Sequence, residues 1–454
     1  MSTARVDPAV PFSCVPGIEW PGLATAAGAR MLAMQWQLER TQWWSPERLR
    51  EQQFRQVRAL ATHAVEHCSF YAAMRARVER LTPATYGDWP RITKRTVQDN
   101  QEGLRARTFP SSHGVASETF TSGSTAEPVR VLVTETGQFF AHAMVVRDHL
   151  WQGRDFKRKF AAIRFMVEQG TQAGWSPSTN AAFATGPAVM ADVTTDVARQ
   201  MDWLLREKPA YLLTSPSNLG ALIAHSKDTG RVPIGLKQAI TYSEAVPEGL
   251  ADRVATLWQA TLVDSYSCRE FGSIALQCPE AGQYHIQSEN AYVEILREDG
   301  SSCEPGESGR VVVTPLHNFA MPLLRYELGD FATLGEACPC GRGLPVIRRI
   351  LGRVRNMARD PSGRVFQPTL DVALRDVLVH SRVRQVQVIQ HTLSALELLY
   401  VRDAELPPAV AEALRAAINQ QLRYPFDIRL SRVDSIPRSR GGKYESFISR
   451  VMDA

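Results

Sequence analysis

Short β-like runs alternate with helical patterns along most of this chain, and this alternation restricts the fold more than any other property of the sequence. Apolar and β-branched residues form the strand-like runs, and apolar residues recur at helical spacing between them. The strand-like runs lie at 129–134, 291–296 and 310–316, and the helical patterns lie around 45–75, 196–206 and 218–227. Ser45 and Pro46 suit the N-cap and first turn of a helix. The pattern predicts an α/β (mixed α+β) fold of β-sheets flanked by helices.

The chain of 454 residues is too long for one hydrophobic core, so we expect at least two domains. The residue pattern of the sequence changes near Leu351-Gly352-Arg353. The segment that follows predicts strands at 384–390 and 396–401, a helix from about Pro407 to Leu422, and a strand near 426–433. We therefore predict a large N-terminal domain over 1–352 and a small, mobile α+β domain over 353–454.

Composition excludes several functional classes. The net charge of +5 is modest and no block of basic residues occurs, so we expect no nucleic-acid partner. No stretch approaches the roughly 20 apolar residues of a membrane helix. The N-terminal segment lacks the basic-then-apolar pattern of a signal peptide. Seven cysteines, an odd number in a long chain, favour a reducing compartment, and we expect a cytoplasmic protein.

A hydroxyl-rich loop, TSGST at 121–125, stands just before the first strand-like run. Successive backbone N–H groups in such a turn form a concavity that binds anions, and Gly123 allows the backbone to approach a ligand closely. A triphosphate is a suitable guest. The same composition is typical of an ordinary surface loop, so composition alone leaves both interpretations open. No lysine follows the glycine, so this is not a P-loop.

Five segments, in order along the chain, resemble the motifs of the adenylate-forming superfamily, which includes acyl-CoA synthetases, luciferases and nonribosomal adenylation domains. They are the TSGST loop, DSYSCREFG (264–272), RYELGD (325–330), LGRVRN (351–356) and RSRGGKYES (438–446). The phrases RITKRTVQDN (91–100), NFAMPLLRYELGD and CPCGRGLP are similar to those of the phenylacetate–CoA ligase-like branch. The resemblance covers nearly the whole chain from about residue 36.

The resemblance implies a reaction and a set of site residues. A small carboxylic acid would attack ATP to give an acyl-adenylate and pyrophosphate, and the acyl group would then pass to coenzyme A. Lys443 would approach the carboxylate and the α-phosphate, and Glu270 would hold Mg²⁺. The residues expected around ATP are Thr121, Ser122, Gly123, Ser124, Thr125, Ser243, Glu244, Tyr266 (against adenine), Asp330 (on the ribose) and Arg353. By position, Phe139, Phe140, His142 and Tyr242 are candidates to contact an acid, which is commonly aromatic in this branch.

Three positions depart from the family's usual pattern: relatives commonly carry glycine at Ala126, threonine at Arg269, and aspartate or lysine at the hinge, where Arg355-Asn356 stand. These departures keep open an enzyme that passes the activated carboxylate, or nitrite, to an amine instead of coenzyme A. A catalytically degenerate nucleotide-binding protein is a third hypothesis, which the intact Lys443, Glu270 and Asp330 oppose. The sequence also leaves the oligomeric state open, with a homodimer as one option.

Two cysteine-containing segments supply ligands for a structural zinc ion. Cys278 with His285, and Cys338 with Cys340, offer the four soft or borderline ligands that a tetrahedral site needs. Some phenylacetate–CoA ligase-like proteins carry such a site, so the resemblance supports it. The alternative is four groups that never meet. Cys268 has no histidine or aspartate companion in the sequence, so we interpret it as a packing residue rather than a nucleophile.

Overall fold

The computed structural model describes residues 11–18, 20–120, 129–165, 167–366, 368, 381–437 and 445–451. The chain divides into two compact units. The first contains the described residues up to Leu328 together with Ala332–Ile350, and the second contains Gly329–Phe331 and the described residues from Leu351 onward. The boundary at 352 remains our prediction for the functional domains.

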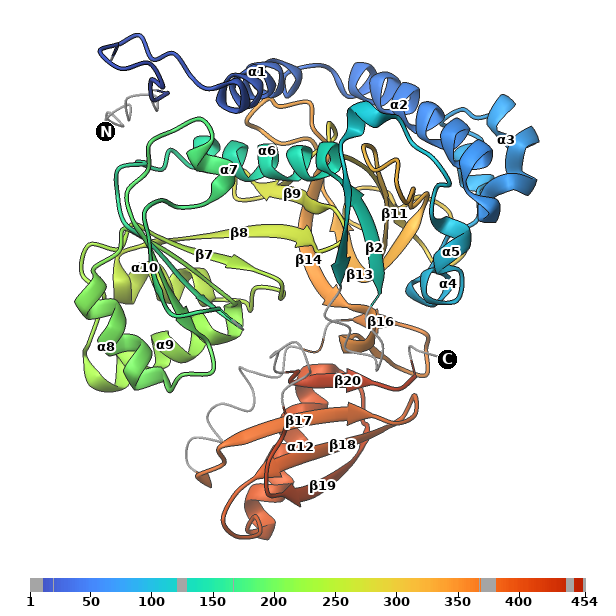
Figure 1. The fold of residues 1–454 in the computed structure, drawn as a ribbon. Coiled ribbons are helices and arrows are strands. Elements are labelled where there is room, and N and C mark those ends of the chain that lie inside the picture. Colours follow the sequence, from blue (N-terminus) through green and yellow to red (C-terminus); the bar gives the residue numbers. More distant parts are fainter. Residues whose placement is uncertain are drawn as a thin grey trace. The chain divides into compact units, whose positions relative to one another are not determined.

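A twelve-stranded mixed sheet dominates the first unit (Figure 1). Its strand order is β11 (Ala291–Leu296), β12 (Ser308–Pro315), β13 (Tyr326–Leu334), β14 (Val346–Arg353), β10 (Tyr284–Ile286), β9 (Gly272–Gln277), β8 (Thr261–Cys268), β7 (Gln238–Tyr242), β6 (Tyr211–Thr214), β3 (Phe160–Arg164), β5 (Ala188–Asp192) and β4 (Gly170–Gln172). Neighbours from β8 to β5 run parallel, whereas β9 is antiparallel to both β8 and β10. Parallel strands need crossover connections, which the helical patterns between them provide.

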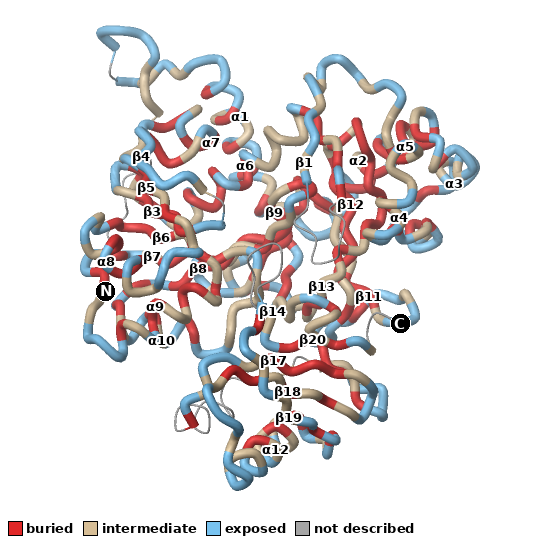
Figure 2. The backbone as a smooth tube through the Cα atoms, turned by 60° about the horizontal axis from the view of Figure 1, so that its bottom comes forward, coloured by how far each residue is buried: buried red, intermediate tan, exposed pale blue. Residues whose placement is uncertain are grey.

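Helices cover both faces of the parallel part of this sheet, because its strands carry apolar residues on both sides. On β3, Ala161 and Ile163 belong to a core shared with α8 (Val197–Glu207), α9 (Pro216–Thr229) and α10 (Leu250–Trp258). The alternate residues Phe160 and Ala162 belong to a core shared with α1 (Ala26–Thr41) and α6 (Glu135–Trp151). Buried residues accordingly follow the central strands in Figure 2.

Helix α2 (Pro46–His67) and the elements after it pack on the antiparallel part of the sheet. Helix α2 begins as predicted, with the Ser45 hydroxyl accepting a hydrogen bond from the Arg48 amide. It ends at His67, earlier than the predicted 75, because Cys68 adopts an extended backbone. Shorter elements follow: η1 (Ser69–Met74), α3 (Arg75–Glu79), η2 (Tyr86–Asp88), α4 (Lys94–Asp99), α5 (Gln101–Leu104) and η3 (Ser111–His113).

A separate antiparallel hairpin contains β1 (Ala116–Phe120) and β2 (Arg130–Thr134). The described residues also include the short helix α7 (Pro177–Asn180). No described helix has the length and apolar character to span a bilayer.

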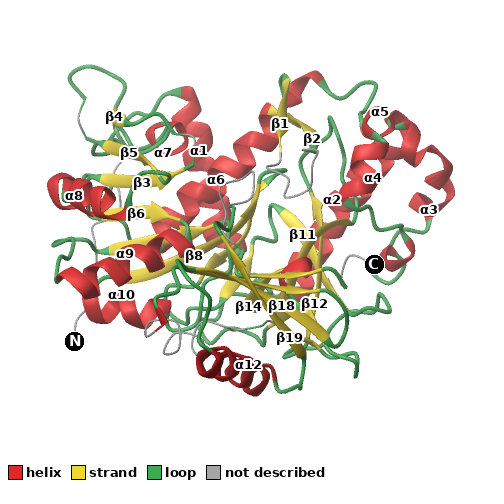
Figure 3. Ribbon diagram, turned by 90° about the horizontal axis from the view of Figure 1, so that it is seen from below, coloured by secondary structure: helices red, strands yellow, loops and turns green. Residues whose placement is uncertain are grey.

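The second unit is built on the four-stranded sheet β19 (Asp427–Val433), β18 (Ala395–Val401), β17 (Gln385–Gln390) and β20 (Phe447–Ser449) (Figure 1; β18 and β19 are also labelled in Figure 3). Helix α12 (Pro408–Leu422) buries Leu414, Ile418 and Leu422 in the same core as Leu398 and Tyr400 of β18. The turn η4 (Val354–Asn356) and the strand pair β15 (Ala358–Arg359) and β16 (Val365–Phe366) precede this sheet in the chain. The predicted α/β fold with a smaller C-terminal α+β part is confirmed.

Candidate functional site

Glu270 lies in the turn between β8 and β9, and its side chain points into the protein. The residue is 9% exposed, and its Oε1 accepts a hydrogen bond of 3.0 Å from the Tyr326 hydroxyl on β13. A carboxylate offers about four lone pairs, so this bond and the one from the Cys268 thiol leave acceptor capacity for a hard cation. Burial and the neighbouring Glu270 carboxylate hold the pKa of Cys268 well above its ordinary value. Cys268 therefore stays a neutral thiol, in agreement with a packing role.

The turn that carries Glu270 requires a glycine two residues later. Gly272 has φ of +87°, and a Cβ at this position would lie 2.7 Å from the Cβ of Ala141 on α6. Only glycine satisfies both the left-handed backbone and the close approach to the helix. Tyr266, four residues before Glu270, is 7% exposed and belongs to the same core as Phe271. The glycine of the motif is thus explained by packing against α6.

Asp264 fixes the strand that carries Tyr266 and leads into the turn with Glu270. Its carboxylate is buried and accepts hydrogen bonds from the Thr241 hydroxyl at 2.6 Å and the Tyr284 hydroxyl at 2.9 Å. Burial raises the pKa of Asp264 to about 6. These bonds tie β8 to β7 and to β10, so the motif's first residue has a structural role that the sequence did not indicate.

The turn after β7 contains the predicted residues Tyr242, Ser243 and Glu244. Ser243 has φ of +68°, an uncommon backbone for a non-glycine residue. The Glu244 Oε2 accepts a hydrogen bond of 3.0 Å from the Ser217 amide in the first turn of α9. Glu244 therefore satisfies a helix N-terminus, which stabilises the strained turn. The Arg164 guanidinium lies 5.3 Å from the centre of the Tyr242 ring.

Helix α6 carries the other residues expected near the acid. The Phe140 ring stacks on His317 with 3.4 Å between the ring centres, and Phe139 lies edge-on to Phe140. His142 is exposed on the helix and does not join this stack. Burial lowers the pKa of His317 to about 4, so its ring is neutral and its Nε2 donates to the Glu289 carbonyl at 2.8 Å. Sequence reasoning missed His317, although it directly precedes the NFAMPLL phrase.

In the second unit, Asp330, which is expected at the ribose, forms an ion pair with Arg353. Arg353 Nε lies 3.0 Å from Asp330 Oδ1, and Gly329 turns the backbone with φ of +75°. Two residues later Arg355 forms an ion pair with Glu445, and the Asn356 amide donates to the Phe447 carbonyl at 2.5 Å. Because Asn356 is the donor in that bond, an aspartate in its place would lose the bond.

Arg325, the first residue of RYELGD, is a buried structural residue. Its guanidinium binds both oxygens of Glu294, at 3.0 and 2.9 Å, and also donates to the carbonyls of Gly87 and Trp89. The residue is 3% exposed and has φ of +53°. Arg325 therefore ties β13 to β11 and to the segment at 86–92. Its place beside Tyr326 fixes the residue that hydrogen-bonds Glu270.

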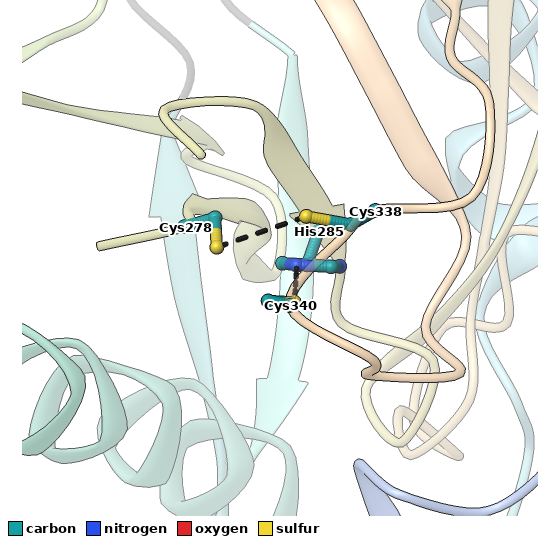
Figure 4. A group of neighbouring side chains, drawn as sticks. All are labelled: Cys278, His285, Cys338 and Cys340. Carbon is teal, nitrogen blue, oxygen red and sulfur yellow. Dashed lines mark hydrogen bonds between the residues drawn. The ribbon is translucent and has the colours of Figure 1, made fainter. Parts of the chain in front are cut away.

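The four predicted metal ligands meet in one cluster (Figure 4). Cys278 follows β9, His285 lies on β10, and Cys338 and Cys340 come from the loop between β13 and β14. All four ligand atoms lie within 4.8 Å of one another. The Cys278–Cys338 sulfur distance of 3.8 Å matches the edge of a tetrahedral zinc–thiolate site, about 3.8 Å for bonds of about 2.3 Å. The donor set thus fits a zinc ion.

Neighbouring groups prepare these residues to bind a cation. Burial lowers the pKa of His285 to about 4, and its Nδ1 lies 3.3 Å from the Leu344 carbonyl. A neutral ring that donates from Nδ1 turns the Nε2 lone pair toward the thiols. Burial opposes the Cys340 thiolate, but hydrogen bonds with Arg342, Cys338 and Cys278 together lower the pKa of Cys340. Arg342 also donates to Gln42 at 2.9 Å, which joins the cluster to the turn after α1.

Two groups of predicted residues lie outside the described residues: Thr121, Ser122, Gly123, Ser124 and Thr125 of the hydroxyl-rich loop, with Ala126, and Lys443 of the C-terminal motif. Their roles remain predictions. Of the remaining predicted residues, the four metal ligands are brought together, and Asp330 is joined to Arg353.

Known proteins similar to this chain share its fold. The sequence model of the AMP-binding enzyme family matches residues 49–320. The phenylacetate-coenzyme A ligase of Thermus thermophilus is 25% identical over 387 residues, which cover 83% of this chain and 84% of that protein. The crystal structure of a 2-hydroxyisobutyryl-CoA ligase in the postadenylation state superposes with a TM-score of 0.69 at 18% identity, covering 90% of this chain and 91% of the other. The amide bond synthetase of Marinactinospora thermotolerans gives a TM-score of 0.51 at 19% identity, covering 76% and 70%.

Proposed function

This chain belongs to the AMP-binding enzyme family, and on that premise we propose that it activates a small carboxylic acid with ATP and transfers the acyl group to coenzyme A. The acid's carboxylate attacks the α-phosphate of ATP, which gives an acyl-adenylate and pyrophosphate. The thiol of coenzyme A then attacks the acyl carbon and releases AMP. The observation that carries this proposal is the buried Glu270, oriented by Tyr326 to offer an oxygen ligand.

The chain's own residues have separate tasks in this scheme. Glu270 holds the magnesium ion that accompanies ATP, and Lys443 neutralises charge at the carboxylate and α-phosphate. Asp330 accepts from the ribose hydroxyls, and Arg353 keeps its carboxylate in place. The other nucleotide contacts that we assign are Thr121, Ser122, Gly123, Ser124, Thr125, Ser243, Glu244 and Tyr266.

We assign an aromatic acid as the substrate class. The stacked pair of Phe140 and His317, with Phe139 at its edge, offers flat apolar surfaces on α6 and the loop after β12. Tyr242 adds a ring at the carboxyl end of β7, the edge at which α/β sheets bind ligands. His142 is exposed and is a weaker candidate. The similarity to a phenylacetate-coenzyme A ligase supports the same class.

One observation favours an amine as an alternative acceptor of the activated acid. Asn356 stands at the hinge position where relatives commonly carry aspartate or lysine, and its amide is committed to the Phe447 carbonyl. This departure is compatible with delivery of the activated acid to an amine rather than to coenzyme A.

We further propose that Cys278, His285, Cys338 and Cys340 hold a structural zinc ion, which cross-links the two segments that carry them and takes no part in the reaction.

A pyrophosphate-release assay tests the proposal. A panel of small aromatic acids is supplied with Mg·ATP alone, with coenzyme A, or with amines. Release that rises with coenzyme A, with a thioester product, is the expected result. Lys443→Ala should lower the rate at least about 100-fold, whereas Lys227→Ala, at an exposed lysine on α9, should not. Full activity of Lys443→Ala would overturn the catalytic assignment, and release that depends on an amine would replace coenzyme A as the acceptor.

A further inference from the structure

We propose that Arg269 binds the terminal phosphates of ATP and the pyrophosphate formed from them. This inference rests on the proposed function, because it concerns the same nucleotide. Arg269 directly precedes Glu270, where relatives commonly carry threonine. The argument depends on where the two adjacent side chains point and on the charges around them.

Arg269 and Glu270 point in different directions. The Glu270 carboxylate is buried against the Tyr326 hydroxyl, whereas Arg269 is exposed and its Nη1 lies 3.5 Å from the Phe120 carbonyl. The distance is at the long end for a hydrogen bond, so this contact orients the guanidinium without occupying all of its five donors. One turn thus presents an acidic group on its inner side and a basic group toward β1.

Phe120 lies at the base of the hydroxyl-rich loop. It is the last residue of β1 and pairs in register with Arg130, the first residue of β2. Residues 121–129 therefore connect two positions whose backbones are adjacent. The Arg130 guanidinium carbon lies 5.7 Å from the centre of the Phe120 ring, so Arg130 and Arg269 both lie beside this residue.

The charges around these two guanidinium groups favour an anion. Among the residues that the structure describes, neither Arg130 nor Arg269 forms an ion pair, and Glu118 on the same hairpin is paired with Arg105 at 2.9 Å. Among the described residues, two positive charges therefore lie beside Phe120 without a paired carboxylate. Lysine or arginine in such a position raises the local concentration of a polyanion.

The chemistry of a guanidinium group suits pyrophosphate better than a hydroxyl does. A threonine donates one neutral hydrogen bond, whereas arginine donates two parallel charge-assisted bonds to phosphate oxygens. The leaving pyrophosphate gains negative charge as the bond to the α-phosphate breaks, and fixed positive charge stabilises that change. AMP lacks the terminal phosphates, so the contribution of Arg269 should be specific to ATP and pyrophosphate.

Nucleotide binding measured by calorimetry separates this role from a structural one. We expect Arg269→Met to weaken Mg·ATP binding roughly 10- to 100-fold while AMP binding changes less than about twofold. Arg269→Lys, which keeps the charge but loses the paired donors, should fall between the two. The matched control Arg80→Met, at an exposed arginine at the end of α3, should bind both nucleotides like the wild type.

Three outcomes would overturn the inference. Wild-type affinity of Arg269→Met for Mg·ATP would show that the side chain does not meet the phosphates. Equal losses for ATP and AMP in both the Met and Lys variants would assign Arg269 a structural role through Phe120. A wild-type protein that binds neither nucleotide would overturn the proposed function as well, which distinguishes the two failures.

Discussion

Replacing Arg325 with methionine is expected to loosen the contact between β13 and the segment at 86–92. The guanidinium is 3% exposed, binds Glu294 through two hydrogen bonds, and donates to two backbone carbonyls. Its removal leaves the Glu294 carboxylate buried without its hydrogen-bonded counter-charge, and only the weaker electrostatic effect of Arg91 remains. Breaking a buried pair in this way costs about 3–5 kcal/mol, because the remaining charge stays desolvated.

Hydrogen–deuterium exchange at Ile92 measures this cost locally. The Ile92 amide donates to the Arg325 carbonyl at 3.1 Å, so it exchanges when 86–92 separates from β13. At about 1.4 kcal/mol per tenfold, Arg325→Met should speed this exchange roughly 140- to 4,000-fold. Arg325→Met/Glu294→Leu should recover most of the protection. Arg310→Met, which disrupts a more exposed pair with Glu327 on the same sheet, should change it less than about fivefold.

The effect should also depend on pH in a defined direction. Burial already raises the pKa of Glu294 above its ordinary value, against the opposing effect of Arg325. Without the guanidinium that pKa rises further, so acidification protonates Glu294 in the folded variant and removes the buried charge. The loss of local stability caused by Arg325→Met is therefore largest above the raised pKa of Glu294, and it shrinks as the pH falls through that pKa. An increase in the Ile92 exchange rate of less than fivefold at pH 7.5, or an increase that does not change with pH, would refute this reasoning.

Three further predictions concern the metal cluster and the turn at Glu270. Purified protein should contain about one zinc per chain by elemental analysis. The Cys338→Ser variant should lose this zinc. Wild-type protein with less than about 0.2 zinc per chain would exclude the site. Tyr326→Phe should lower the kcat/KM for Mg·ATP roughly 10- to 100-fold, because Glu270 loses the hydrogen bond that orients it. The variant should also need a higher magnesium concentration for its half-maximal rate. An unchanged magnesium dependence would contradict the orienting role of Tyr326. Gly272→Ala should lower the free energy of unfolding by about 1–3 kcal/mol because its Cβ would meet Ala141 at a positive φ; chemical denaturation measures this, and a neutral result would show that α6 can shift.

Local patterns in the sequence predicted local structure well. The run at 291–296 is strand β11, and the helix expected from about 407 to 422 is α12. The error at the end of α2 arose because apolar spacing continues beyond His67, whereas the extended backbone of Cys68 ends the helix. Periodicity reports which face of an element is apolar, but not where its backbone turns.

The site was predictable where residue type restricts chemistry. Two cysteine-containing segments predicted a four-ligand cluster, because few arrangements of three thiols and one imidazole other than a metal site are common. The hydrogen bond of Glu270 with Tyr326 and the ring stacking of Phe140 on His317 join residues far apart in the chain, so no local pattern could indicate them. Glu244 was expected at the nucleotide, and no local pattern indicated its hydrogen bond with the Ser217 amide.

The strand order of the large sheet has a consequence for synthesis on the ribosome. Strands β3 to β8 come from one continuous stretch and can pair as soon as Cys268 has emerged, whereas β10 waits for β14, a later segment, to cover its other side. Between Ile286 and Arg353 the nascent chain keeps an open strand edge for roughly 3–13 s at ordinary translation rates. Open edges recruit other strands, so chains interrupted before Val346 should be the aggregation-prone products of this gene.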